Sequence, residues 1–394
     1  MLGRRLLAIS FVLGILLSCR SREGDPGTSS GSTPDAGGFD KAALLRAFGD
    51  CAFGTYKEFQ VEAIAFDAAA KSGDVAAAQE AWKKAMDVWE RAEVIKYGPA
   101  AMTGQPGGQD LRDPIYAWPL VGRCLIDQTI ADKLYESPTF TTTSLVSTRS
   151  LAAAEYLLFE PTTQNGCPAD NDINAKGTWA ALGDAEIQKR KLDYVKVIAA
   201  DVIVRAQKLV DAWDPAKGNF ITEIASAGSS KTFASQQLAF NAVSDAMFYL
   251  DIEVKNMKVG QPAKLDESCA APPCSGVVES PWAKRSKEHI RANMDGYDKL
   301  LRGCGPGNTG LGFDDLLGAV GAPQVATKLD DSVAQIRAAL DALKEPSFED
   351  DIAKNPAGVR ALFDALRNNA VVMKTEMASV LNLELPKVVA SDND

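Results

Sequence analysis

The chain has 394 residues, 46% of them hydrophobic, and its 42 Lys and Arg against 52 Asp and Glu give a formal net charge of −10. This length predicts two domains of ordinary size. The acidic balance and the absence of a basic stripe exclude nucleic acid as a partner.

The first residues have the form of an export signal. Arg4 and Arg5 precede an apolar run, Leu6 to Leu17, that is too short to stay in a bilayer as a permanent helix. The run ends in Leu16-Leu17-Ser18-Cys19, which resembles a bacterial lipobox. We therefore expect residues 1–18 to be a lipoprotein signal peptide and Cys19 to carry a lipid that binds the membrane.

The segment after Cys19 is rich in Gly, Ser, Pro and Asp, which indicates a flexible tether over residues 19–38. Its first residue is Arg20 rather than Asp. By resemblance to sorting signals of Gram-negative bacteria, this favours the outer membrane, with the folded part facing the periplasm of the cell envelope.

Six cysteines follow Cys19, and an even number in an exported protein indicates disulfides. Cys269 and Cys274 flank a short Ala-Ala-Pro-Pro loop, and we expect them to form one local bridge. The pairing of the other four stays open: Cys51, Cys124, Cys167 and Cys304. The spacing lacks a repeated Cys-x-x-Cys, which argues against a metal–thiolate cluster.

Helical periodicity recurs along the folded part, and no long strand-like alternation occurs. Ala78, Trp82, Ala85, Trp89 and Ala92 step by four and three residues, which places them on one helix face. The first half predicts helices at 40–71, 75–97, 120–135, 147–161 and 184–213.

The second half repeats this pattern, with helices predicted at 240–257, 282–301, 323–344 and 359–380. Its Met and aromatic stripes indicate core packing. We expect an all-α protein of two antiparallel helical bundles, at 39–214 and 215–388, joined near Asp214 to Gly218.

The helix at Ser147 to Pro161 carries an unusual carboxylate. Ser147 or Thr148 can cap its start, and Pro161 ends it. Glu155 lies among apolar residues with no cation three or four positions away. It is therefore either a half-exposed residue at the rim of the core or a buried carboxylate that needs a partner from elsewhere.

The chain has one histidine, His289, in the charged segment KRSKEHIRAN. A single histidine excludes a His-Glu-x-x-His zinc site and a paired Glu-x-x-His di-iron centre. No Gly-x-Ser-x-Gly elbow accompanies it for a serine hydrolase. We expect His289 to lie on the surface of its helix.

Several segments together resemble the imelysin family, also called the M75 peptidase family of exported bacterial proteins. In chain order, the matching segments are Ala81 to Pro99, Tyr116 to Pro119, the Glu155 helix, Asp245 to Pro262, Val278 to Gly303 and Met373 to Leu385. The resemblance spans nearly all of residues 40 to 386. It implies two helical bundles with a groove between them.

The signature of that family is Gly-x-His-x-x-Glu, proposed as a metal or active site. Its Glu falls on Glu155, its His on Ala152 and its Gly on Ser150. His and Glu three residues apart share a helix face and can offer a nitrogen and a carboxylate to a cation. Here Ala152 offers no ligand, so the motif is degenerate.

Three functions are compatible with these residues. The first is a membrane-tethered, non-enzymatic binding protein for iron, another divalent metal or a small ligand. Its candidate site residues are Glu155, Glu93, Asp113 and Tyr116, whose carboxylate and phenol oxygens suit hard cations. The second is a metallopeptidase, which the missing histidine disfavours. The third is a scaffold for an envelope protein partner. We favour the binding protein.

Overall fold

The computed structural model describes residues 37–265 and 278–390, and every regular element in them is a helix. The α-helices are α1 (Lys41–Ser72), α2 (Val75–Glu93), α3 (Arg123–Ala131), α4 (Phe140–Thr143), α5 (Val146–Arg149), α6 (Leu151–Phe159), α7 (Asp172–Ala175), α8 (Thr178–Trp213), α9 (Phe220–Ala225), α10 (Gln236–Met247), α11 (Gln261–Ala263), α12 (Ser286–Arg302), α13 (Phe313–Ala319), α14 (Pro323–Asp341), α15 (Phe348–Lys354), α16 (Pro356–Val372), α17 (Ala378–Leu381) and α18 (Lys387–Ala390). Two 3₁₀-helices, η1 (Gly98–Ala100) and η2 (Leu134–Glu136), and two π-helices, η3 (Leu250–Gly260) and η5 (Met373–Met377), complete the set. The all-α prediction is confirmed.

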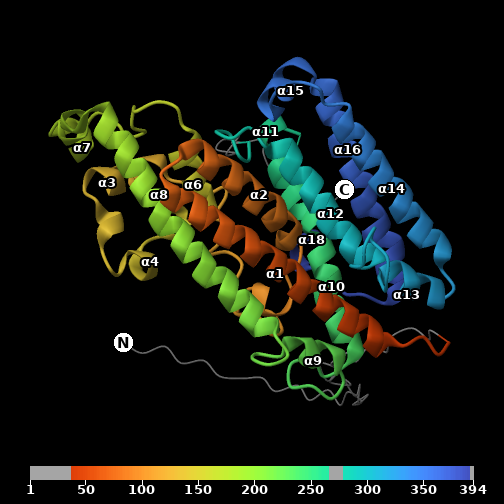
Figure 1. Cartoon of the computed structure of the whole chain (residues 1–394). Helices are drawn as coiled ribbons and strands as arrows, with labels where there is room; N and C mark the ends of the chain where they lie inside the picture. Colours follow the sequence, from red (N-terminus) through yellow and green to blue (C-terminus); the bar gives the residue numbers. More distant parts are fainter. Residues whose placement is uncertain (1–36, 266–277, 391–394) are drawn as a thin grey trace, which may run out of the picture. The chain divides into compact units, whose positions relative to one another are not determined.

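Helices α1, α2, α6 and α8 pack together in the first half (Figure 1). Asp40 caps the start of α1, and Asp74 caps α2 directly after the left-handed Gly73, so the two helices form a tight hairpin. The predicted stripe of α2 is buried: the rings of Trp89 and Phe59 lie 4.7 Å apart.

In the second half, α14 and α16 pack against each other and α16 packs on η3 (Figure 1). Asn355 caps the start of α16 with its side chain. Farther along that helix, the Asn369 amide donates to Ser332 of α14 and to Tyr297 of α12. This buried polar link fixes the three helices relative to one another.

The two halves meet along α2 and α12, which lie side by side. Gly296 permits the approach, because a Cβ at that position would lie 2.4 Å from the carbonyl oxygen of Arg91. After the predicted junction at 214–218, α9 still packs on α1. The boundary between two bundles therefore stays a prediction.

Several predicted helices begin or end elsewhere. The helix predicted at 147–161 is broken at Ser150, whose extended backbone separates α5 from α6. The helix predicted from Trp282 begins at Ser286, and the one predicted at 120–135 is α3 followed by η2. The helix predicted at 240–257 changes from α to π geometry after Met247.

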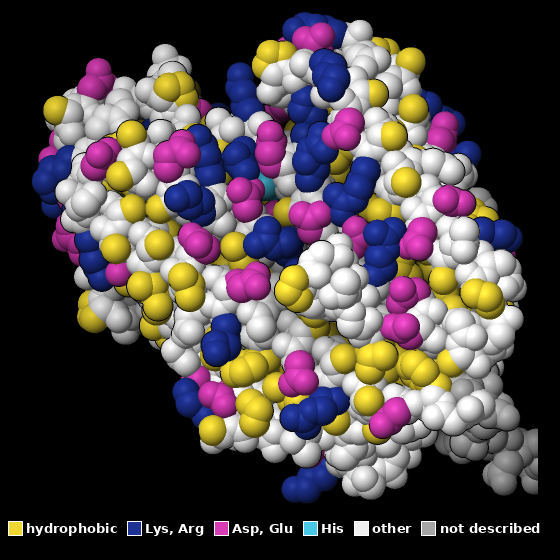
Figure 2. Space-filling model, turned by 45° about the vertical axis from the view of Figure 1, so that its right-hand side comes forward, with side chains coloured by type: hydrophobic (Ala, Val, Ile, Leu, Met, Phe, Trp, Pro, Cys, Tyr) yellow, Lys and Arg dark blue, Asp and Glu magenta, His cyan; other side chains and the backbone are white. Residues whose placement is uncertain are grey.

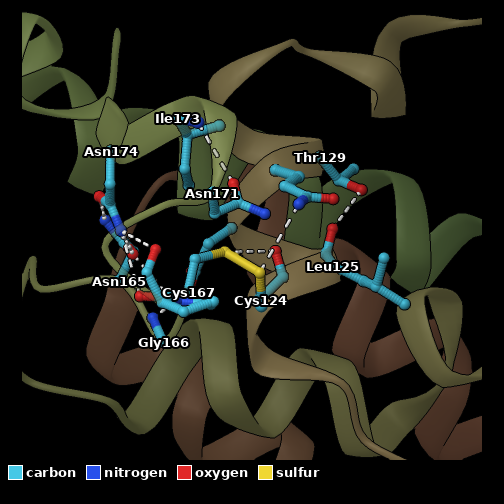
Figure 3. Close-up of a disulfide and its surroundings, with 12 residues drawn as sticks. Cys124, Leu125, Thr129, Asn165, Gly166, Cys167, Asn171, Ile173 and Asn174 are labelled. Carbon is cyan, nitrogen blue, oxygen red and sulfur yellow. Dashed lines mark hydrogen bonds between the residues drawn. A yellow bond between two sulfur atoms is a disulfide. The ribbon is translucent and has the colours of Figure 1, made fainter. Parts of the chain in front are cut away.

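The structure pairs the four cysteines whose partners the sequence left open. Cys51 of α1 bonds to Cys304, just beyond the end of α12, and so joins the two halves. Cys124 of α3 bonds to Cys167, in a loop held by hydrogen bonds from Asn174 to two backbone carbonyls (Figure 3). Cys269 and Cys274 lie outside the described residues.

The predicted signal peptide, Cys19 and most of the tether also lie outside the described residues. Within residues 37–265 and 278–390, no helix combines the length and apolar character that a membrane crossing requires.

Candidate metal centre

Three buried side chains converge where α2, α12 and the segment 278–285 meet. Glu90 comes from α2, Glu279 from the segment and His289 from α12. The Nδ1 atom of His289 lies 3.3 Å from Glu90 Oε1 and 3.5 Å from Glu279 Oε2. Their ligand atoms all lie within 4.8 Å of one another, and the described residues contain no second such group of three.

Part of this donor set lacks a hydrogen bond of good geometry. Glu90 Oε1 and both ring nitrogens of His289 are buried without a hydrogen bond to any described residue. Glu279 Oε2 forms an ion pair with Lys258 at 3.0 Å, but the geometry is not that of a hydrogen bond. Unpaired buried polar atoms are costly in folded proteins, so the cluster has capacity for a further cation or donor.

Lys258 supplies a cation of the chain's own at the edge of the cluster. Its Nζ lies 2.7 Å from Glu90 Oε2, 2.9 Å from the side-chain oxygen of Asn293 and 3.0 Å from Glu279 Oε2. Lys258 belongs to the π-helix η3, a geometry often found at functional sites. The ammonium occupies one side of the carboxylates and leaves Glu90 Oε1 to His289.

Asn293 orients Glu90. Its amide donates to Glu90 Oε2 at 2.9 Å and to the Glu90 backbone carbonyl at 2.8 Å. His289, Asn293 and Gly296 recur at helical spacing on α12 and are buried at the contact with α2. This face of α12 therefore carries polar or small residues where it packs against α2.

The electrostatics of the cluster follow from burial and the short distances. Burial alone raises the pKa of Glu279, but Lys258 and His289 outweigh it and bring the pKa below its usual value. Burial alone lowers the pKa of His289, but Glu90 and Glu279 raise it overall. For Glu93, burial and the nearby Glu90 raise the pKa.

Glu155 lies beside this cluster and anchors the segment that carries Glu279. Its Oε1 accepts hydrogen bonds from Ser280 Oγ at 3.0 Å and from the backbone N–H groups of Trp282 and Ala283 at 3.0 and 2.9 Å. It is 1% exposed, and burial raises its pKa to about 7. The interpretation as a half-exposed rim residue is wrong, because the segment 278–285 covers the carboxylate.

The anchored segment has an unusual backbone. Ser280 and Lys284 both have positive φ angles, 53° and 56°, which non-glycine residues rarely adopt. Such conformations persist where surrounding contacts enforce them, and they gather at functional sites. Here the three bonds to Glu155 enforce the conformation that presents Glu279 to His289.

The structure brings three of the four predicted site residues together. The Tyr116 hydroxyl donates to Glu279 Oε1 at 3.1 Å. Glu93 accepts from the Tyr249 hydroxyl at 2.6 Å and lies 3.9 Å from Lys258 Nζ. Asp113 is apart from them, because its carboxylate is 59% exposed and pairs with the neighbouring Arg112.

The two degenerate motif positions lie at the start of α6. Ser150 is the N-cap residue and is fully buried, but its hydroxyl makes no capping bond and has no partner among the described residues. The expected caps, Ser147 and Thr148, belong instead to α5. Ala152 is 1% exposed and offers no ligand.

The surface prediction for His289 is wrong. The side chain is 0% exposed, because α12 turns this face onto α2 despite the charged residues around it in sequence. Sequence reasoning also missed Glu90, Glu279, Lys258 and Asn293. A signal for Glu90 was present: like Glu155, it has no cation three or four positions away on its helix.

Figure 2 shows a hollow in one face of the molecule, surrounded by Lys, Arg, Asp and Glu side chains, with the colour of the single histidine at its base. Because His289 is 0% exposed, the gap above it is too narrow for water. A cation can enter only when side chains around the hollow move.

The donor set decides which cations fit. One imidazole nitrogen with two carboxylate oxygens suits iron, zinc or manganese. The four described cysteines are all in disulfides, so thiolate ligands from them are excluded. The arrangement can therefore hold a divalent transition metal of intermediate hardness.

Comparisons with known proteins agree with this fold. A family model described as imelysin, peptidase M75, matches residues 50–373. Iron-regulated protein A of Synechococcus elongatus is 24% identical over 321 residues, covering 81% of this chain and 77% of that protein. A crystal structure described as an iron-regulated protein A precursor from Parabacteroides distasonis has a TM-score of 0.66 at 18% identity, covering 89% of this chain and 97% of the other.

Proposed function

The chain belongs to the imelysin family, and we propose that it is a lipid-anchored envelope protein that binds a divalent transition metal, iron foremost, at Glu90, Glu279 and His289. The similarity to proteins described as iron-regulated supports iron as the metal. Binding for uptake or storage, without hydrolysis, is the proposed role.

One observation carries the proposal: carboxylate and imidazole donors from three separate segments converge in a buried place without well-formed hydrogen bonds. Glu90 Oε1 and His289 Nδ1 are 3.3 Å apart, close enough for one ion to contact both. A purely structural cluster would join such atoms by hydrogen bonds of good geometry. These two form only a long ion pair outside that geometry, as expected of ligands arranged for a cation.

Charge supports the same conclusion. Three carboxylates, from Glu90, Glu93 and Glu279, surround the single ammonium of Lys258. The nearby carboxylates raise the pKa of His289, and burial with Glu90 raises the pKa of Glu93, so bound protons compensate the remaining negative charge. A divalent cation beside Lys258 would displace those protons and take over the compensation.

Burial favours binding over peptide hydrolysis. A metallopeptidase needs an open position on the metal for water and a channel that admits a polypeptide. The three candidate ligands are at most 1% exposed, and the segment 278–285 covers them. The imidazole of His289 on α12 supplies the nitrogen ligand that Ala152 cannot supply. His289 is buried, so this nitrogen does not give the site an open position.

The anchoring part of the proposal rests on the N-terminal sequence. Arg4 and Arg5, the apolar run and the Leu-Leu-Ser-Cys sequence support lipidation at Cys19, and Arg20 supports the outer membrane. Replacing Cys19 by Ala should release the protein from membrane fractions. Retention in the membrane would contradict the anchor without affecting the metal proposal.

Metal titration of residues 20–394 tests the centre. We expect one Fe²⁺ or Zn²⁺ per chain, with affinity reduced at least about tenfold in Glu90→Gln and His289→Gln. Asp351→Asn is the matched control, because Asp351 is also fully buried and paired with a lysine, outside the cluster.

Thermal unfolding of each variant separates the loss of a ligand from the loss of the fold. Equal metal affinity in all three variants and the unmodified protein would exclude the centre. Metal-stimulated cleavage of a protein substrate, abolished in His289→Gln, would instead support the peptidase.

A further inference from the structure

A separate cavity of about 250 Å³ is lined by residues that follow the end of α2 and by residues of the second half, none of them in the metal centre. The first half contributes the segment from Lys96 to Met102 and the loop at Arg112. The second half contributes Asp245 of α10 and Glu253 of η3. This volume is below the range of drug-sized pockets, which limits the occupant to a small molecule.

The cavity contains cations held in a fixed position. Arg112 and Lys96 have side chains 18% and 20% exposed, and both lie over the ring of Tyr249. Arg112 uses Nε for Asp113 and Nη1 for the carbonyl of Glu93. The Nη2 group has no partner among the described residues, so two N–H donors of a planar guanidinium are available.

The cavity also contains unpaired acceptors. Glu253 binds Lys96 through Oε1 at 2.7 Å, whereas its buried Oε2 has no hydrogen-bond partner among the described residues. Asp245 lines the same cavity, and burial raises its pKa to about 7. Free donors and free acceptors therefore line the same cavity.

Apart from Gln105 and Tyr97, the remaining lining is apolar. Ala100, Ala101, Met102 and Ile252 contribute hydrocarbon surface between the polar groups. An occupant must therefore combine an apolar body with both a negative and a positive group. A plain carboxylate leaves the Glu253 oxygen unpaired, and a plain amine leaves the Arg112 donors unpaired.

We propose that this cavity binds a small apolar amino acid, with its carboxylate on Arg112 and its ammonium on Glu253. The exposed carboxylate of Asp113, which accepts from Arg112 Nε, repels a ligand carboxylate on Nη2 of the same guanidinium. The groups lie close to the metal centre: Tyr249 contacts both cavity cations and donates to Glu93, which lies beside Lys258. The site itself needs no metal.

Three matched probes test the proposal by calorimetry in the presence of a chelator, which keeps the result independent of the metal centre. Leucine carries both charges, 4-methylpentanoate lacks the ammonium, and 3-methylbutylamine lacks the carboxylate. We expect leucine to bind about tenfold more tightly than either, because each charge-assisted bond adds to affinity. Equal or weaker binding of leucine would overturn the proposal.

Two variants identify the groups. Asp113→Asn removes the repelling carboxylate. It should raise the affinity for leucine and for 4-methylpentanoate about threefold and leave the affinity for 3-methylbutylamine unchanged. Glu253→Gln should lower the affinity for leucine about tenfold, and it should not lower the affinity for 4-methylpentanoate. Asp87→Asn is the control, because Asp87 is an exposed acid paired with Arg285 outside the cavity. The same effect in Asp87→Asn as in Asp113→Asn would refute the assignment.

Discussion

Lys287 and Lys258 are two of the mostly buried lysines of the second half, and their surroundings differ. Lys287, 12% exposed, binds one carboxylate, Asp351, at 2.8 Å and two backbone carbonyls. Lys258, 1% exposed, contacts the carboxylates of Glu90 and Glu279, with Glu93 at 3.9 Å. One lysine is in a simple pair, and the other is in a cluster of three carboxylates and an imidazole.

The difference separates a complete ion pair from the proposed binding site. Around Lys287, the second oxygen of Asp351 accepts from the backbone N–H of Glu345, so the pair is complete. Around Lys258, the outer oxygen of Glu90 and the ring of His289 have no hydrogen bonds. Both lysines are buried, but only the second is surrounded by carboxylate and imidazole atoms that lack hydrogen bonds.

The largest expected effect comes from removing each lysine. Lys287→Met and Lys258→Met should each lower the free energy of unfolding by about 3–5 kcal/mol, because a buried carboxylate loses its cation. Zn²⁺ or Fe²⁺ should restore stability in Lys258→Met alone, since a metal can replace the ammonium there. Chemical denaturation of each variant with and without metal measures the loss of stability and its recovery. Recovery by metal in Lys287→Met as well would mean that the two lysine environments do not differ in metal binding.

The two disulfides differ in which parts of the chain they join. Cys51–Cys304 joins α1 to the end of α12, the helix of His289, whereas Cys124–Cys167 closes a loop within the first half. Replacing either pair by serines should cost about 2–5 kcal/mol. We expect weaker metal binding in the Cys51/Cys304 variant alone, measured by titration at a temperature where both variants are folded. Equal affinities would mean that α12 holds its place without the bridge.

Glu155→Gln tests how the covered segment depends on pH. Burial holds the pKa of Glu155 near 7, above its unfolded value near 4.5, so the native state binds the extra proton. The wild type therefore loses stability relative to the Gln variant as pH rises from about 4.5 to 7, by up to about 3 kcal/mol. Unfolding curves at pH 5 and 7.5 measure it. A constant difference between the proteins would contradict the pKa shift.

The sequence predicted the helices better than the centre. Apolar stripes such as Trp82 and Trp89 depend on local periodicity, so α2 was found with its buried face correct. The burial of Glu90 and His289 depends on α12 packing against α2, with about 200 residues between them in sequence. The charged residues around His289 in the sequence therefore led to the prediction of a surface position, which is wrong. For Glu155 the sequence left two interpretations open, and the buried carboxylate with a partner from elsewhere was one of them; Ser280, Trp282 and Ala283 are those partners.

The smallest effect is expected from Ala152→His, which restores the family's histidine on α6. Ala152 is 1% exposed and its neighbours on α6 are buried, so an imidazole there overpacks the core and should cost about 1–3 kcal/mol. Because His289 of α12 already provides the nitrogen, we expect no gain in metal affinity. Metal titration of Ala152→His, alone and combined with His289→Gln, shows which of the two helices can supply the ligand nitrogen. Recovered binding in the double variant would show that α6 can still reach the cluster, and that the imidazole of α12 is one of two equivalent solutions.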